Sequence, residues 1–269
     1  MSIPYWKFDP TGNITLLAEG SFPPEERKRL ADLLMQLEPD AEQVGFLSPG
    51  DSECDLSLTM TGGEFCGNAS LSAAAWLLEK RQLPRGDVSL RVSGAPEPVT
   101  VSIEKQGGDW VGSLQMPPVK RISMETLPLG DKFFQLPVVW FPGICHCILT
   151  SPISRQQAEN AIRQWGRLLD TPALGLMLYH ENDHLLTPLV WVSGADTLFW
   201  ENSCASGTSA VGAWLAEEAR TSIQRDLIQP GGTLHIEAGA PSDGSTLRLS
   251  GRVRLLKSSF LQQASSVPD

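Results

Sequence analysis

The chain is poor in basic residues and has no long hydrophobic run. Its 269 residues include 21 lysines and arginines against 31 acids, which gives a formal net charge of −10. Proteins that bind nucleic acid or an anionic membrane surface present a basic face, so this balance argues against both partners. No apolar stretch approaches the roughly 18 residues that a membrane-spanning helix needs.

Cysteine is also scarce. Five cysteines in a chain of this length are too few for a disulfide scaffold, and an odd number cannot all pair internally. The opening residues 1–8 lack the basic-then-apolar layout of a secretory signal. We therefore expect reduced thiols and a cytoplasmic location. Because no Cys-x-x-Cys pair occurs either, we expect no bound metal.

The periodicity of apolar residues predicts many strands and few helices, which is typical of an α+β fold. Helical patterns cover 23–38, 67–80, 154–168 and 205–220. Strand-like runs cover 15–19, 44–47, 88–92, 99–104, 138–141, 145–149, 175–179, 189–192, 233–237 and 248–256.

The chain contains a weak internal repeat around two of its cysteines. When Cys66 is aligned with Cys204, three later positions coincide: an alanine, a tryptophan and a leucine (Ala75/Ala213, Trp76/Trp214, Leu77/Leu215). Both cysteines precede Gly/Ser-rich helical patterns. A cysteine alone reads most simply as a small buried hydrophobe, but packing gives no reason to repeat this context. The repeat predicts two equivalent halves, each with a cysteine where a loop enters a helix.

A helix start suits acid–base chemistry by a thiol. Its first N–H groups lack helical acceptors and carry partial positive charge, which favours a thiolate. The small residues in 67–70 and 205–208 let a ligand carboxylate approach these N–H groups. Two such sites facing each other would place one sulfur on each side of a carbon next to the carboxylate. A thiolate could then remove a proton while a thiol returns one on the opposite face, and we expect this inversion to need no cofactor.

These motifs resemble the diaminopimelate epimerase family. Cys66-Gly-Asn-Ala, after Gly-Gly-Glu-Phe, resembles its first cysteine motif, and Cys204-Ala-Ser-Gly-Thr-Ser-Ala resembles its second. Four other segments are similar to the family in the same order along the chain: 7–13, 42–47, 145–147 and 251–255. The resemblance spans nearly the whole chain, which makes it far more specific than any single motif.

The resemblance implies two pseudo-symmetric halves, each a β-rich layer around a central helix, with the active site in the cleft between them. The first half would comprise residues 1–118, with a C-terminal strand at 251–262 returning to it, and the second would comprise 119–250. A homodimer is also implied by the family.

The resemblance further implies roles for individual residues. Cys66 and Cys204 would be the catalytic acid–base pair. His146 and Glu201 are candidates to orient or polarise the thiols. Glu201 stands at a spacing that differs from the family's usual glutamate, and His146 also reads as a strand histidine whose ring nitrogens are satisfied by hydrogen bonds. Substrate contacts are implied at six residues: Asn13, Gln43, Gly67, Asn68, Ala205 and Ser206.

Departures from the family pattern bear on the substrate. Ile144 and Ala173 stand where diaminopimelate epimerases have asparagines that grip the second amino-acid head of their substrate, and a Glu-Arg pair before the second cysteine is absent. A charged amine and carboxylate buried against Ile and Ala would be unpaired and costly. We therefore expect a free amino acid with a less charged side chain, and the pattern is similar to racemases, independent of pyridoxal phosphate, that act on histidine.

Three alternatives stay open at this point: diaminopimelate epimerase itself, a related-fold isomerase with different chemistry, and an amino-acid-binding protein. Retention of both cysteines favours inversion over the last two.

A separate sequence motif, His180-Glu-Asn-Asp-His184, matches a zinc-protease motif that requires a helix. The apolar runs on either side predict strand, turn and strand instead, so we interpret it as a hairpin tip.

Overall fold

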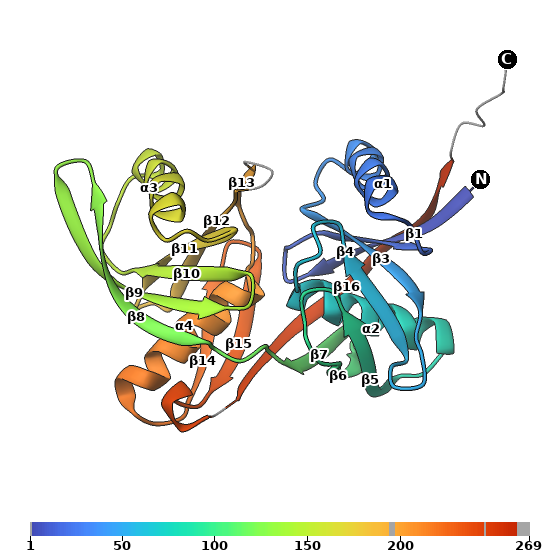
Figure 1. Ribbon diagram of the computed structural model, residues 1–269. Helices are drawn as coiled ribbons and strands as arrows, with labels where there is room; N and C mark the ends of the chain where they lie inside the picture. Colours follow the sequence, from blue (N-terminus) through green and yellow to red (C-terminus); the bar gives the residue numbers. More distant parts are fainter. Residues whose placement is uncertain (1, 194–196, 245, 263–269) are drawn as a thin grey trace, which may run out of the picture. The chain divides into compact units, whose positions relative to one another are not determined.

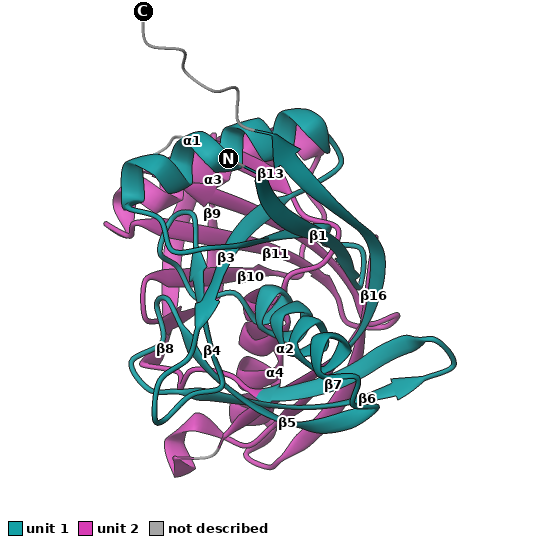
Figure 2. Cartoon of the chain, turned by 90° about the vertical axis from the view of Figure 1, so that its right-hand side faces the viewer, with its two compact units in different colours: residues 1–114, 251–269 teal, residues 115–250 magenta. Residues whose placement is uncertain are grey.

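The computed structural model describes residues 2–193, 197–244 and 246–262. The chain divides into two compact units, shown in different colours in Figure 2: Met1–Leu114 with Gly251–Asp269 (unit 1), and Gln115–Ser250 (unit 2). The sequence placed this boundary at residue 118 and assigned the strand 251–262 to the first half.

Unit 1 is built from strands that close around one helix, α2 (Figure 1). Successive neighbours are β1 to β7, and β16 pairs with both β7 and β1, so the strands return on themselves. The elements are β1 (Ser2–Pro10), β2 (Thr15–Glu19), α1 (Pro24–Leu37), β3 (Gln43–Pro49), β4 (Leu56–Met60), α2 (Gly67–Arg81), β5 (Arg85–Val92), β6 (Val99–Gln106), β7 (Asp109–Gln115) and β16 (Leu247–Gln262).

Helix α2 is the core of unit 1. Every residue from Gly67 to Leu78 is buried, because small and apolar residues cover all sides of the helix rather than one stripe. The first turn is therefore held at a fixed place inside the unit. Helix α1, in contrast, is amphipathic and buries only Leu30, Ala31 and Leu34.

Unit 2 also has a buried helix, α4, beside its strands. Successive neighbours are β8-β9-β10-β11-β12-β14-β15-β16, and β13 pairs with β12. The elements are β8 (Arg121–Leu129), β9 (Lys132–Phe141), β10 (Ile144–Leu149), α3 (Arg155–Leu168), β11 (Ala173–His180), β12 (Leu185–Val192), β13 (Thr197–Trp200), α4 (Ala205–Ala219), β14 (Ile223–Gln229), β15 (Gly232–Ala238) and the short 3₁₀ helix η1 (Pro241–Asp243). Helix α4 contacts β9, β10, β11, β14 and β15.

Helix α3 shows how sequence sets a boundary in unit 2. Its first N–H groups are satisfied by a capping box, in which Ser154 and Gln157 bond reciprocally. Its apolar face packs on β11 and β12, with Trp165 fully buried. Gly166 is required where the helix meets the Trp191 ring, since a Cβ there would lie 2.3 Å from a ring carbon.

The predicted elements agree with this structure. All four helices are present within two residues of their expected bounds, and the ten expected strands all occur. The hairpin interpretation of 180–184 is confirmed, because β11 ends at His180 and β12 begins at Leu185 with a turn between them. The result is a β-rich fold with few helices. None of the described helices combines the length and apolarity needed to cross a bilayer.

Candidate active site

Cys66 is the residue that caps α2. Its backbone is extended (φ −132°, ψ 114°), so the side chain turns back and Sγ accepts the N–H of Ala69 at 3.4 Å. The Ser70 hydroxyl donates to the Cys66 carbonyl at 2.8 Å. The thiol itself donates to Oε1 of Gln43, on β3, at 3.0 Å. Cys66 is half-buried, so its sulfur is held by polar groups without being sealed from solvent.

Gln43 joins Cys66 to a chain of polar side chains inside unit 1. Its Nε2 donates to Oδ1 of Asn13 and, at 2.8 Å, to Oγ1 of Thr15. Asn13 is buried and donates to Oε2 of Glu42 at 2.6 Å. The structure thus brings together Cys66, Gln43 and Asn13, which the sequence had assigned separately to catalysis and substrate contact.

The turn before Asn13 has a strained backbone. Thr11 has φ 58°, a left-handed conformation that a β-branched residue rarely adopts. It is held by its hydroxyl, which donates to the Arg252 carbonyl of β16 at 3.1 Å. The next amide, of Gly12, donates to the Asp9 carboxylate at 2.5 Å. Such strain persists only where neighbouring groups enforce it. Here it fixes the direction in which the backbone leads into Asn13. Sequence analysis missed Thr11, since a Thr-Gly pair indicates a positive φ only at the glycine, whereas here Thr11 adopts one as well as Gly12 (φ 85°).

Cys204 caps α4 in nearly the same conformation, with φ −128° and ψ 109°. Its Sγ accepts the N–H of Gly207 at 3.3 Å, and the Thr208 hydroxyl donates to its carbonyl at 2.7 Å. The sulfur also lies 3.6 Å from the Ser206 hydroxyl oxygen. Cys204 is more deeply buried than Cys66, with 5% of its surface exposed.

The charge environment of Cys204 favours the protonated thiol. Its pKa is raised well above the usual value, most strongly by burial and next by the hydrogen-bonded carboxylate of Glu201. The Ser206 hydroxyl and the Gly207 amide act in the opposite direction but are outweighed. The helix-start argument alone favours a thiolate, so at this cysteine desolvation and a like charge reverse it. The structure brings Glu201 to the thiol despite its unusual spacing in the sequence.

His146 lies in the middle of β10 and is completely buried. Burial lowers its pKa to about 3, so the imidazole is neutral. Among the described residues neither ring nitrogen has a hydrogen-bond partner. The ring packs edge-on to Phe141 and directly against Gly175, where the absence of a side chain leaves room for it. The neighbouring Cys145 and Cys147 are buried thiols whose pKa values burial raises. The role of His146 in orienting a catalytic thiol stays a prediction.

The first turns of α2 and α4 offer N–H groups to an anion. The amides of Gly67, Asn68, Ala205 and Ser206 belong to the opening turns, where helical geometry provides no acceptor. These are the residues expected from the sequence to hold a substrate carboxylate.

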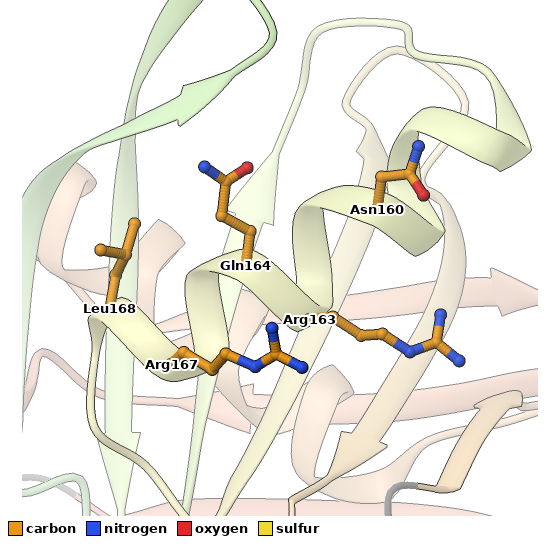
Figure 3. Close-up of a pocket in the computed structure, with 5 residues that line it drawn as sticks. All are labelled: Asn160, Arg163, Gln164, Arg167 and Leu168. Atoms are coloured by element: carbon orange, nitrogen blue, oxygen red, sulfur yellow. The ribbon is translucent and has the colours of Figure 1, made fainter.

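A surface hollow elsewhere in unit 2 does not share these features. It has a volume of about 490 Å³ and is lined by one face of α3 (Asn160, Arg163, Gln164, Arg167 and Leu168), as Figure 3 shows. It contains neither a thiol nor a helix start. Within the described ranges, no three histidine, cysteine or acidic side chains gather as a metal site would require.

Comparison with known families decides the affiliation. The family model described as "Histidine racemase CntK N-terminal domain" matches residues 2–258. The chain belongs to this family. The histidine racemase of Staphylococcus aureus (strain Mu50) is 28% identical over 242 residues, covering 86% of this chain and 87% of its own. The histidine racemase of Fusobacterium nucleatum subsp. nucleatum (strain ATCC 23726) is 31% identical over 238 residues, covering 85% and 86%.

Solved structures show the same fold at lower identity. A probable proline racemase from Agrobacterium radiobacter K84 has a TM-score of 0.73 at 15% identity, covering 99% of this chain and 94% of that one. A PhzF-family protein from Bacillus anthracis has a TM-score of 0.71 at 12% identity, covering 98% and 100%. This histidine racemase family member therefore has the fold of proline racemases and PhzF proteins. Its predicted resemblance to histidine racemases, and its class as an isomerase of the racemase and epimerase type, are confirmed.

Proposed function

We propose that this protein is a cofactor-independent histidine racemase that inverts Cα with two cysteines, one acting as thiolate and the other as thiol. The observation that carries the proposal is the matched placement of Cys66 and Cys204. Each caps a buried helix with an extended backbone, and each sulfur accepts the N–H three residues later. Membership of the histidine racemase family supports the reaction.

The proposed proton transfers balance without an added group. The thiolate of one cysteine takes the Cα proton, and the electron pair delocalises onto the substrate carboxylate. The thiol of the other cysteine then donates its proton to the opposite face of Cα. The reverse direction exchanges the two roles. N–H groups of the first helical turns, at Gly67, Asn68, Ala205 and Ser206, would stabilise the negative charge that develops on the carboxylate.

The partners of the two sulfurs suggest different resting states. Cys204, buried beside Glu201, begins as the proton donor. When Cys204 must instead act as base, the Glu201 carboxylate is placed to accept the thiol proton. Cys66 has a neutral partner in Gln43, and Gln43 and Asn13 would contact the substrate on that side. This two-base scheme requires both thiols to reach one Cα, as in the diaminopimelate epimerase-like arrangement of pseudo-symmetric halves that the family resemblance implies.

Histidine is the proposed substrate for two reasons. The curated relatives that cover most of this chain are named histidine racemases. In addition, Ile144 and Ala173, at the starts of β10 and β11, are apolar where a second zwitterionic head would need polar partners. Homodimer formation and a cytoplasmic location stay predictions.

Racemisation in D₂O tests the proposal. The reduced protein, after dialysis against a chelator and without pyridoxal phosphate, is incubated with L-histidine and with a panel that includes diaminopimelate, followed by chiral analysis and mass spectrometry. We expect D-histidine with deuterium at Cα. Cys66→Ser and Cys204→Ser should each abolish inversion while the fold is kept. Turnover of diaminopimelate alone, or no exchange at histidine, would overturn the proposed substrate.

A further inference from the structure

Gln229, the last residue of β14, forms a closed hydrogen-bonded ring with the backbone of Cys204. Its Oε1 accepts the Cys204 N–H at 2.8 Å, and its Nε2 donates to Oγ1 of Thr208 at 2.9 Å. The Thr208 hydroxyl in turn donates to the Cys204 carbonyl at 2.7 Å. Gln229 is buried, with 5% of its surface exposed, so the ring is shielded from competing water.

We infer that Gln229 is a positioning residue for Cys204, an inference that rests on the proposed catalytic role of that thiol. The ring holds the groups on both sides of the Cys204 α-carbon, and so fixes the φ and ψ that turn Sγ towards the Gly207 N–H and Glu201. A primary amide suits this position because it accepts through oxygen and donates through nitrogen at the same time. A carboxylate could only accept, and an apolar side chain could do neither.

Comparison with Cys66 shows that the glutamines of the two sites bond to different atoms of their cysteines. Ser70 donates to the Cys66 carbonyl as Thr208 does to that of Cys204. The glutamine of the first site, Gln43, bonds to the sulfur itself. At the second site the glutamine bonds to the backbone, and the side chain of Glu201 forms the hydrogen bond with the sulfur. The chemistry of Cys204 therefore depends on Gln229 through geometry, without contact between the amide and the thiol.

Substitution of Gln229 should lower kcat rather than raise KM. A misplacement of about 1 Å at a reacting group costs roughly 100-fold in rate, so we expect Gln229→Leu to reduce kcat about 10- to 100-fold in both directions, with KM for histidine within about twofold. Loss of the ring also frees the buried thiol to move, so the alkylation rate of Cys204 should rise several-fold while that of Cys66 stays unchanged. Gln224→Leu, which replaces an exposed glutamine on the same strand, is the matched control and should change neither.

Gln229→Glu separates the two hydrogen bonds of the amide. The acceptor for the Cys204 N–H is kept, the donor to Thr208 is lost, and a carboxylate is added near the thiol. We expect intermediate kcat and, in the direction in which Cys204 acts as the base, an acidic limb of the kcat profile displaced to higher pH, because an added negative charge disfavours the Cys204 thiolate. A purely structural role for Gln229 would lower the melting temperature and leave kcat at the optimum pH unchanged.

The measurements distinguish failure of this inference from failure of the proposed function. If the wild type does not racemise histidine, the proposed function fails, and peptide-resolved alkylation of Cys204 and Cys66 still reports on positioning. If the wild type is active and folded Gln229→Leu keeps kcat within twofold, the inference is overturned. Equal changes in the alkylation of both cysteines would overturn it as well, since they would indicate general loosening. If Gln229→Leu does not fold, the Gln229→Glu profile decides.

Discussion

Replacement of Glu38 by glutamine should destabilise unit 1 by about 3 kcal/mol at neutral pH. Glu38 caps the C-terminus of α1 and is buried, with 6% of its surface exposed. Burial alone would raise its pKa, but hydrogen bonds from Lys257, Tyr5 and Lys7 outweigh burial and lower it from 4.5 to about 2. These partners lie on β1 and β16, so the carboxylate ties α1 to two strands of the unit.

The magnitude follows from linkage. At about 1.4 kcal/mol per pKa unit, a pKa lowered from 4.5 to about 2 corresponds to about 3 kcal/mol of stability. A folded-state pKa below the unfolded value gives stability that is complete well above pH 4.5 and is lost as the pH falls towards 2. More than half of the contribution should therefore be gone at about pH 3. Removal of one partner from a buried charged cluster gives a similar magnitude.

Urea unfolding of the wild type and Glu38→Gln at pH 7 and pH 3 measures this contribution. Asp40→Asn is the matched control, because Asp40 is an exposed partner of Lys7 and should contribute less than about 1 kcal/mol. We expect a difference of about 3 kcal/mol between wild type and Glu38→Gln at pH 7 that shrinks to roughly half or less at pH 3. A difference below about 1 kcal/mol at pH 7, or one that does not change with pH, would refute the reasoning.

Three further predictions concern the site. Gly175→Ala should destabilise the protein by more than about 2 kcal/mol in thermal or urea unfolding, because its Cβ would lie 2.0 Å from Nδ1 of buried His146; wild-type stability would contradict this packing. Glu201→Gln should speed the alkylation of Cys204 at pH 7 while Cys66 is unaffected, since the carboxylate raises the pKa of the Cys204 thiol; an unchanged Cys204 rate would argue against their coupling. Mild air oxidation should abolish racemisation and a reductant should restore it; activity indifferent to both would count against catalytic thiols.

The sequence alone determined the helices and most of the strands, because local periodicity and end signals are strong there. The first turn of α1, with Pro24 and two acids, and the capping residues of α3 are read directly from neighbouring residues. Six strands were not predicted from the sequence: β1, β4, β7, β8, β13 and β14. For β8 and β14 there is a physical reason. Strand β8 has only Leu127 buried, and β14 carries Arg225 and Asp226 in mid-strand, so neither shows a clear alternation.

The two cysteines could also be found from sequence, since each stands directly before a small-residue helix and the pattern occurs twice. What surrounds them could not. Gln229 reaches Cys204 across 25 residues, and Thr11 is held in a strained conformation by Arg252, 241 residues away. The same holds for the protonation of Cys204, which depends on how far folding removes the thiol from water beside Glu201. Local patterns thus determine which residues are available for chemistry. Only the tertiary structure decides their partners and their charge, because both depend on burial and on contacts between distant segments.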